Sequence, residues 1–298
     1  MKRRIRRALS LAASIALVAG TGVAINPAAQ AAVIPAGAVK VLDDLASIPI
    51  ATSMYPSYAA TGRDNIAYYQ DGTGSVYVVS GGGGTTGSQL KVFKYDAAFT
   101  SAELVTAKTY ADYPVWGGFH QGTDGNFYVV VGHDNITEND AQNVIGVYKY
   151  NAAWTQTGVL HIKSGDVRHS TSFKGIYEVF RSGNLRMATA GGHLYIDQGR
   201  SMYAQSDGLN HQTNLPLDVN TSTLTYTIMG HYQSHSFNQF VLTDGSTLYF
   251  LNHGDGYNRA LELAKYNLSG GTATSAGKTS LITFDGTLGQ NATGTTAT

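Results

Sequence analysis

Two stretches of the chain decide its fold, "LKVFKYDAAFT" (90–100) and "IGVYKYNAAWT" (145–155). Each alternates apolar with polar residues and ends in Lys-Tyr, followed by an Asp or Asn that begins a turn. Alternation with a period of two indicates a β-strand with one buried face. A third copy is "LELAKYNLSGG" (261–271), and "LPLDVNTSTLT" (215–225) is a drifted copy that keeps only the turn. The unit therefore repeats along the chain.

A hairpin precedes each of these strands. The four hairpins are "QDGTGSVYVVSGG" (70–82), "GTDGNFYVVVGHD" (122–134), "GGHLYIDQG" (191–199) and "LTDGSTLYFLNHGD" (242–255). Asp-Gly between strand-forming residues predicts a type I′ turn, in which both central residues have positive φ. Hairpin and following strand together give four modules, around 64–115, 116–174, 175–234 and 235–290.

All-β modules of this size are typical of β-propeller blades. We expect a β-propeller-like array of about four four-stranded blades over 64–290, preceded by an N-terminal segment (32–63) and followed by a polar tail (291–298). Four blades is the lower end of the usual range of roughly four to eight. The array is therefore either a small propeller or an incomplete larger one. A β-sandwich is the alternative.

The N-terminus predicts a secretory signal peptide over residues 1–31. "KRRIRR" supplies a basic segment, "ALSLAASIALVAG" an apolar core and "AQA" at 29–31 a small-residue cleavage motif. The apolar run is shorter than the roughly 20 residues that span a bilayer. We therefore expect a secreted, extracellular protein with no membrane insertion after cleavage.

Composition narrows the partners of the mature chain. Cleavage removes five basic residues and leaves 15 Lys and Arg against 20 Asp and Glu, a net charge of −5. A mildly acidic chain without a basic run is a poor candidate for binding nucleic acid. The chain has no cysteine, which excludes disulfides and thiol chemistry. Its 35 Gly and 19 Tyr with only 6 Pro favour short strands joined by tight turns.

Oxygen-bearing side chains are densest in "GHDNITENDAQN" (132–143). Calcium takes six to eight oxygen ligands, so His133, Asp134, Glu138 and Asp140 are candidate metal ligands, with calcium as the cofactor. The alternative is a solvated loop between two strands. Three histidines, His120, His211 and His235, are candidates for an axial transition-metal site, and hydrogen-bonded structural roles are the alternative.

Polar residues also gather after the second strand of each module and in "SMYAQSDGLNHQTNL" (201–215). In a propeller the equivalent loops open on one face, so these residues could surround one site. Amides, imidazoles and a tyrosine ring suit a polyhydroxy ligand; a structural polar network is the alternative. The candidate ligand-binding residues are Tyr203, Asp207, Asn210, His211, Gln212, His235, Asn238, His253, Asp255 and Arg259.

The stretches at 182–215 and 234–260 resemble a group of uncharacterised exported bacterial proteins with β-propeller-like repeats. The most distinctive pieces are Leu185-Arg186-Met187, the run from Asp207 to Gln212, and His253-Gly254-Asp255. The resemblance covers most of 64–267 and implies a surface or extracellular module. It carries no assigned reaction.

These observations predict a secreted binding protein that recognises carbohydrate or a cell-surface polymer through loops on one face. No nucleophile elbow, zinc-protease motif or phosphate loop occurs in the sequence. An extracellular polysaccharide lyase or glycoside hydrolase remains an alternative, because its acids and bases could come from different blades. A protein-interaction scaffold is the third.

Overall fold

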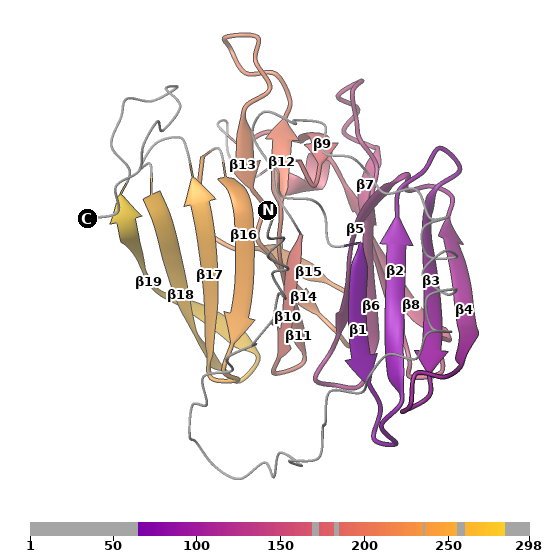
Figure 1. The fold of residues 1–298 in the computed structure, drawn as a ribbon. Helices are drawn as coiled ribbons and strands as arrows, with labels where there is room; N and C mark the ends of the chain where they lie inside the picture. The colour runs from indigo at the N-terminus through magenta and orange to yellow at the C-terminus, as the bar shows by residue number, and fades with distance from the viewer. Residues whose placement is uncertain (1–64, 169–172, 182–184, 235, 255–259, 284–298) are drawn as a thin grey trace, which may run out of the picture. The chain divides into compact units, whose positions relative to one another are not determined.

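The computed structural model describes residues 65–168, 173–181, 185–234, 236–254 and 260–283. These residues form nineteen β-strands, with one 3-10 turn at Gly165–Val167 (Figure 1). The all-β prediction is confirmed.

Four of the sheets are four-stranded and antiparallel, and each comes from one repeat unit. Sheet 1 contains β1 (Ile66–Gln70), β2 (Val76–Gly82), β3 (Ser88–Tyr95) and β4 (Ala102–Tyr110). Sheet 2 contains β5 (Val115–Gln121), β6 (Phe127–Gly132), β7 (Asn143–Tyr150) and β8 (Gln156–Lys163). Sheet 3 contains β10 (Arg186–Ala190), β11 (His193–Asp197), β14 (Leu217–Asn220) and β15 (Tyr226–Ile228). Sheet 4 contains β16 (Ser236–Thr243), β17 (Thr247–Gly254), β18 (Ala260–Ser269) and β19 (Thr272–Thr283).

A small fifth sheet was not predicted. It has the order β13 (Gln212–Asn214), β12 (Gly199–Met202) and β9 (Ile176–Val179), and all three strands belong to the third repeat unit. The chain leaves sheet 3 after β11, forms the β12–β13 hairpin, and returns to sheet 3 at β14. This excursion explains why the third copy of the repeat looks drifted in the sequence.

The stretches 90–100 and 145–155 each contain the turn between the third and fourth strands of a sheet. In sheet 1 the Asp96 carboxylate accepts the backbone N–H of Thr100 at 2.7 Å. In sheet 2 the Asn151 side-chain oxygen accepts two backbone N–H groups at 3.0 Å. In sheet 3 Asn220 accepts the N–H groups of Ser222 and Thr223. A side chain thus satisfies turn donors that have no strand partner.

Within each of these turns a large apolar residue has positive φ: 54° at Phe99, 58° at Trp154 and 54° at Leu224. Trp154 is buried by this conformation; its ring stacks on Phe127 at 4.7 Å between centroids, and its Nε1 donates to the Tyr69 hydroxyl at 3.2 Å. The turn therefore joins sheet 2 to sheet 1.

The predicted type I′ geometry of the Asp-Gly hairpins is wrong. Gly74, Gly125 and Gly245 have positive φ, but the three aspartates before or near them do not. The Asp carboxylates instead accept turn N–H groups, as Asp244 does from Ser246 and Thr247. Among the residues that the structure describes, both central residues of a hairpin turn have positive φ only where both are glycine, at 191–192 and 270–271. A carboxylate that binds its own turn favours the ordinary right-handed conformation at Asp.

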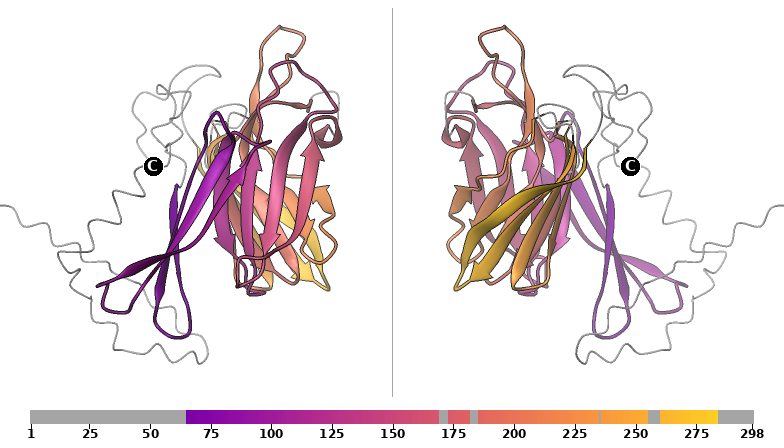
Figure 2. Two further views of the ribbon diagram at one scale, coloured as in Figure 1. Left: turned by 90° about the vertical axis from the view of Figure 1, so that its right-hand side faces the viewer. Right: turned by 90° about the vertical axis from the view of Figure 1, so that its left-hand side faces the viewer.

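The apolar core is divided among the sheet interfaces. One cluster, with Trp116 and Val129, packs between sheets 1 and 2. A second, with Val130 and Leu194, involves sheets 2 and 3, and a third, with Tyr195 and Phe250, lies between sheets 3 and 4. The right-hand view of Figure 2 shows the twist of the long strands β18 and β19, at the yellow end of the colour scale.

Candidate functional site

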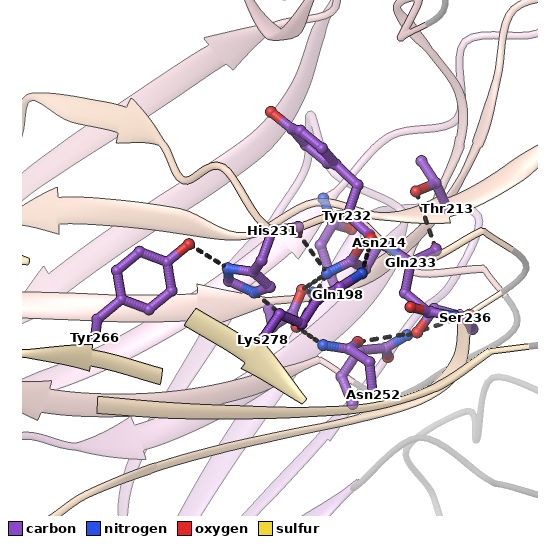
Figure 3. Close-up of polar contacts among 12 residues, drawn as sticks. Gln198, Thr213, Asn214, His231, Tyr232, Gln233, Ser236, Asn252, Tyr266 and Lys278 are labelled. Atoms are coloured by element: carbon purple, nitrogen blue, oxygen red, sulfur yellow. Dashed lines mark hydrogen bonds and ion pairs between the residues drawn. The ribbon is translucent and has the colours of Figure 1, made fainter. Parts of the chain in front are cut away.

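A set of buried polar side chains lies where the small sheet meets sheets 3 and 4 (Figure 3). We call it the buried polar network; its members are Asp197, Gln198, Arg200, Thr213, Asn214, His231, Gln233, Ser236, Gln239 and Asn252, each no more than 7% exposed. Interiors rarely hold so many polar groups together without a structural or functional reason.

Asn214 connects the parts of the network. Its Nδ2 donates to the carboxylate of Asp197 at 3.1 Å and to the carbonyl oxygen of His231 at 3.3 Å, and its Oδ1 accepts the N–H of Gln233 at 2.7 Å. The segment 229–234 lies outside the named strands, and Asn214 bonds to its backbone at His231 and Gln233. Part of the network is therefore structural.

Asp197 ends β11 and is fully buried. Its carboxylate accepts hydrogen bonds from Asn214, from the N–H of Gln198 at 3.0 Å and from Asn252 Nδ2 at 3.0 Å. Asn252 lies on β17 and in turn accepts from the Ser236 hydroxyl at 2.9 Å. The carboxylate thus links sheet 3, the small sheet and sheet 4.

A chain of three groups runs from Asp197 through His231 to Tyr266. His231 Nδ1 lies 2.9 Å from the Tyr266 hydroxyl, and His231 Nε2 lies 3.7 Å from Asp197 Oδ2. Burial, with the nearby Tyr232 and Asp197, raises the pKa of Tyr266 to about 12, so its hydroxyl keeps its proton at neutral pH. The Tyr266 hydroxyl can therefore donate to His231 while the imidazole presents its other nitrogen toward Asp197.

Arg200, on β12, is fully buried and lacks a counter-charge among the described residues. Its Nη1 donates to the Val167 carbonyl at 3.4 Å, whereas Nε and Nη2 have no hydrogen-bond partner there. Burial lowers the pKa of Arg200 to about 10. The partner-free atoms form one edge of the guanidinium, the edge that binds carboxylates in a bidentate manner.

One aromatic side chain, Tyr232, lies near this guanidinium. Its ring is tilted against that of Phe173, with centroids 4.2 Å apart. Both rings are partly exposed, whereas Arg200 itself is fully buried.

Other network atoms also lack partners. Within the described ranges, Gln198 Nε2, His231 Nε2 and Gln239 Oε1 are buried and make no hydrogen bond. A buried polar atom without a partner costs about 1–3 kcal/mol. Several in one network indicate that polar atoms from outside the protein, such as water or a ligand, complete it.

The predicted ligand-binding residues are dispersed around this network. His253 is exposed near the end of β17, directly after Asn252, and Asn238 is its cross-strand neighbour in β16. His235, Asp255 and Arg259 lie outside the described residues, as does the side chain of Asn238. Asn238 and His253 thus lie beside the network, and Asp197, Arg200, His231 and Tyr266 were not among the predicted residues.

The β12–β13 hairpin holds the other predicted residues. At its exposed tip His211 Nε2 lies 2.7 Å from Asp207 Oδ2. Backbone donation from Leu209, followed by His211, lowers the pKa of Asp207. Asn210 donates to the Met202 carbonyl at 2.8 Å, and Gln212 begins β13.

Tyr203 does not offer the open ring face that sugar stacking requires. It is 3% exposed, its hydroxyl accepts from Asn135 at 2.8 Å, and the Arg168 guanidinium covers its ring at 5.1 Å. Its hydroxyl and its ring are both occupied by other side chains of the protein.

The proposed calcium ligands of the 133–140 loop do not converge. Asp134 accepts the N–H of Val179 at 2.9 Å, Glu138 accepts the N–H of Ala204 at 2.8 Å, and Asp140 pairs with Arg168 at 2.5 Å. His133 bonds through Nδ1 to a neighbouring carbonyl. No group of three or more His, Asp or Glu that could hold a metal occurs in the part of the chain that the structure describes. The loop instead fastens sheet 2 to the small sheet.

The predicted axial histidines are likewise not brought together where they are described. His120, on β5, lies 3.2 Å from the Thr189 hydroxyl on β10, and burial lowers its pKa to about 4. His211 is bound to Asp207 at the hairpin tip. His120 is thus a structural link between sheets 2 and 3.

Among the described residues, no helix is long and apolar enough to cross a membrane.

Comparison with known proteins gives no family. Neither a protein-family profile nor a curated protein matches the sequence. Among solved structures, the crystal structure of the polysaccharide lyase Uly1 is similar with a TM-score of 0.47 and 11% identity, over 74% of this chain and 51% of that one. The chain thus spans about half the length of that structure. A likeness at this level transfers neither a fold nor an activity.

Proposed function

We propose that this is an exported, β-propeller-like protein that binds an acidic polysaccharide, with Arg200 as the residue that receives a sugar carboxylate. The observation that carries the proposal is the buried guanidinium whose Nε and Nη2 have no partner among the described residues. A carboxylate is the planar, bidentate anion that fits this edge.

Energetics support a ligand over a purely structural arginine. Burying an ion without a counter-charge costs several kcal/mol. The described residues supply no carboxylate to Arg200. Gln198 contributes a further partner-free donor two positions earlier in the chain. An incoming carboxylate would neutralise the charge, and its oxygens or the adjacent hydroxyls would accept from the amide.

The arrangement of the sheets and the N-terminal sequence also support the proposal of an exported, propeller-like binding protein. Four consecutive four-stranded antiparallel sheets, each packed on the next, are the arrangement from which propellers are built. The basic and apolar segments of residues 1–31 support export. Export would place the site where extracellular polysaccharides occur.

Binding can be measured by calorimetry on the full mature chain, titrated with oligogalacturonate and with a neutral oligosaccharide of the same length. We expect the acidic ligand to bind and Arg200→Met to abolish that binding. Arg186→Met is the matched control, because the guanidinium of Arg186 lies on the ring of Phe240, 5.5 Å from its centroid, instead of in the network. Unchanged acidic-sugar binding in Arg200→Met would refute the assignment.

A polysaccharide lyase is the second candidate, and the Asp197–His231–Tyr266 chain is the observation that favours it. In a β-elimination a base removes the proton beside the sugar carboxylate, the C–O bond to the next sugar breaks, and a proton goes to the departing oxygen. A histidine paired with a protonated tyrosine can exchange such protons. Turnover would appear as ultraviolet absorbance of the new C=C bond; binding without that absorbance identifies a binding protein.

A further inference from the structure

A polar cavity lies in a different part of the chain from the buried polar network. It has a volume of about 460 Å³, within the range of roughly 300–1,000 Å³ typical of ligand pockets. It is lined by Thr85, Ala111, Asp112, Pro114, His133, Gln142 and Asn143. These residues lie in the connections that follow β2, β4 and β6, and at the first position of β7, in the first two repeat units. The network belongs to the third and fourth units.

Two polar side chains of this cavity, Asp112 and Asn143, are not used by the fold, whereas those of Gln142 and His133 bond to backbone carbonyl oxygens. Elsewhere in the chain, loop aspartates are bound to their own turns, as Asp96 is to Thr100 and Asp124 is to Asn126. No hydrogen bond or ion pair within the described ranges involves the side chains of Asp112 or Asn143. Free acceptors in a pocket are available to a ligand.

A contact with the backbone determines which ring nitrogen of His133 carries the hydrogen. Its Nδ1 bonds to the carbonyl oxygen of Asp134. A carbonyl only accepts, so Nδ1 carries the hydrogen and neutral His133 keeps Nε2 as an acceptor. Together with the Asp112 carboxylate and the Asn143 amide oxygen, it makes the cavity rich in acceptors.

These acceptors favour a ligand that supplies donors and carries no negative charge of its own. Sugar hydroxyls are such donors, and the Asp112 carboxylate repels a uronate. Ala111 and Pro114 provide apolar surface for the carbon face of a ring. We propose that this cavity is a second subsite, which binds a neutral sugar residue.

This inference rests on the proposed function in one respect: both sites would then hold the same polymer. The cavity includes the β2–β3 and β6–β7 connections, and the network includes the equivalent end of β17. Equivalent connections of propeller blades open on one face. A polysaccharide that alternates acidic and neutral residues is the ligand that would use both sites.

The test uses charge at Asp112. Calorimetry on the full mature chain would compare neutral gluco- and galacto-oligosaccharides with oligogalacturonate, for the wild type and for Asp112→Lys, Asp112→Asn and Asn143→Ala. A hydrogen bond to a charged group contributes about 1.5–3 kcal/mol, so we expect roughly ten-fold or greater loss of neutral-sugar affinity in Asp112→Lys. Asp112→Asn should lose less. Glu103→Gln is the matched control, because Glu103 is exposed on β4 of the same repeat unit.

The outcomes separate the two proposals. Loss of neutral-sugar binding in Asp112→Lys and Asn143→Ala, with oligogalacturonate binding retained, supports the subsite. Failure of the wild type to bind any neutral oligosaccharide, or equal binding by all the variants, overturns it. Neither result changes the role of Arg200, which depends only on oligogalacturonate and the Arg200→Met variant. Unaltered melting curves would show that the variants are folded.

Discussion

Replacing Arg200 by methionine should stabilise the ligand-free protein. A pKa of about 10 in place of the ordinary 12.5 means that burial disfavours the charged form. The charged Arg200 therefore destabilises the folded protein by roughly 3 kcal/mol at neutral pH. This destabilisation disappears as the pH rises from about 10 to 12.5, because the folded protein releases the proton before the unfolded chain does. Methionine fills similar space without a charge.

The substitution also removes one hydrogen bond, from Arg200 to the Val167 carbonyl at 3.4 Å. Such a bond contributes about 1 kcal/mol, so the net gain should be about 1–3 kcal/mol. For a chain of this size each kcal/mol raises the melting temperature by roughly 2–4 °C. Arg200→Lys keeps a charge and should give no such gain.

The assay is urea unfolding at neutral pH, followed by circular dichroism and by fluorescence of the buried Trp116 and Trp154. Both tryptophans lie in the core between sheets 1 and 2, so dichroism is needed to report on the rest. A loss of more than about 1 kcal/mol in Arg200→Met without ligand would refute the reasoning. It would mean that the arginine already has a counter-charge in the folded protein.

Other predictions concern particular contacts. Gly81→Ala should destabilise by about 1–3 kcal/mol in denaturant titration, because an added Cβ would lie 2.1 Å from the Trp116 ring; retained stability would show that the ring can move. Asn151→Ala should cost about 1–2 kcal/mol through two lost turn hydrogen bonds, and Asn151→Asp should cost less. His120 should titrate near pH 4 by NMR, and stability should fall as the pH drops from about 6.5 toward 4, because the unfolded chain binds the proton first; a titration near 6.5 would contradict its burial. Tyr266→Phe should retain oligogalacturonate binding, and it should slow elimination if the protein is a lyase.

The repeated turns and strands were predictable because they are local. The alternation before Asp96 and Asn151 indicated the strands, and the turn residue itself carries the hydrogen bonds that close each turn. The four copies of the repeat predicted four four-stranded sheets, and the structure contains them. The type I′ geometry failed because an aspartate can bind its own turn without positive φ.

The buried polar network was not predictable in the same way. Asp197 and Arg200 occur in "YIDQGRSM", where polar residues interrupt a strand pattern and suggest an exposed loop. Their burial depends on the small sheet, whose strands pair across a long sequence separation. The interruption of a strand pattern by Asp, Gln and Arg was the one sign of this network in the sequence. The acids proposed as metal ligands in the 133–140 loop do not converge, since each has a partner distant in the sequence.

The division of the core among successive sheet interfaces has a consequence for how the protein loses structure. Each apolar cluster is shared by neighbouring sheets, so the stability of one sheet depends mainly on the sheets beside it. Coupling between nearest neighbours allows an end unit to open while interior units stay folded. Sheet 1, joined to sheet 2 through Trp154 and Tyr69, can detach without dismantling the network around Asp197. Hydrogen exchange should therefore proceed sheet by sheet, in place of a single cooperative opening.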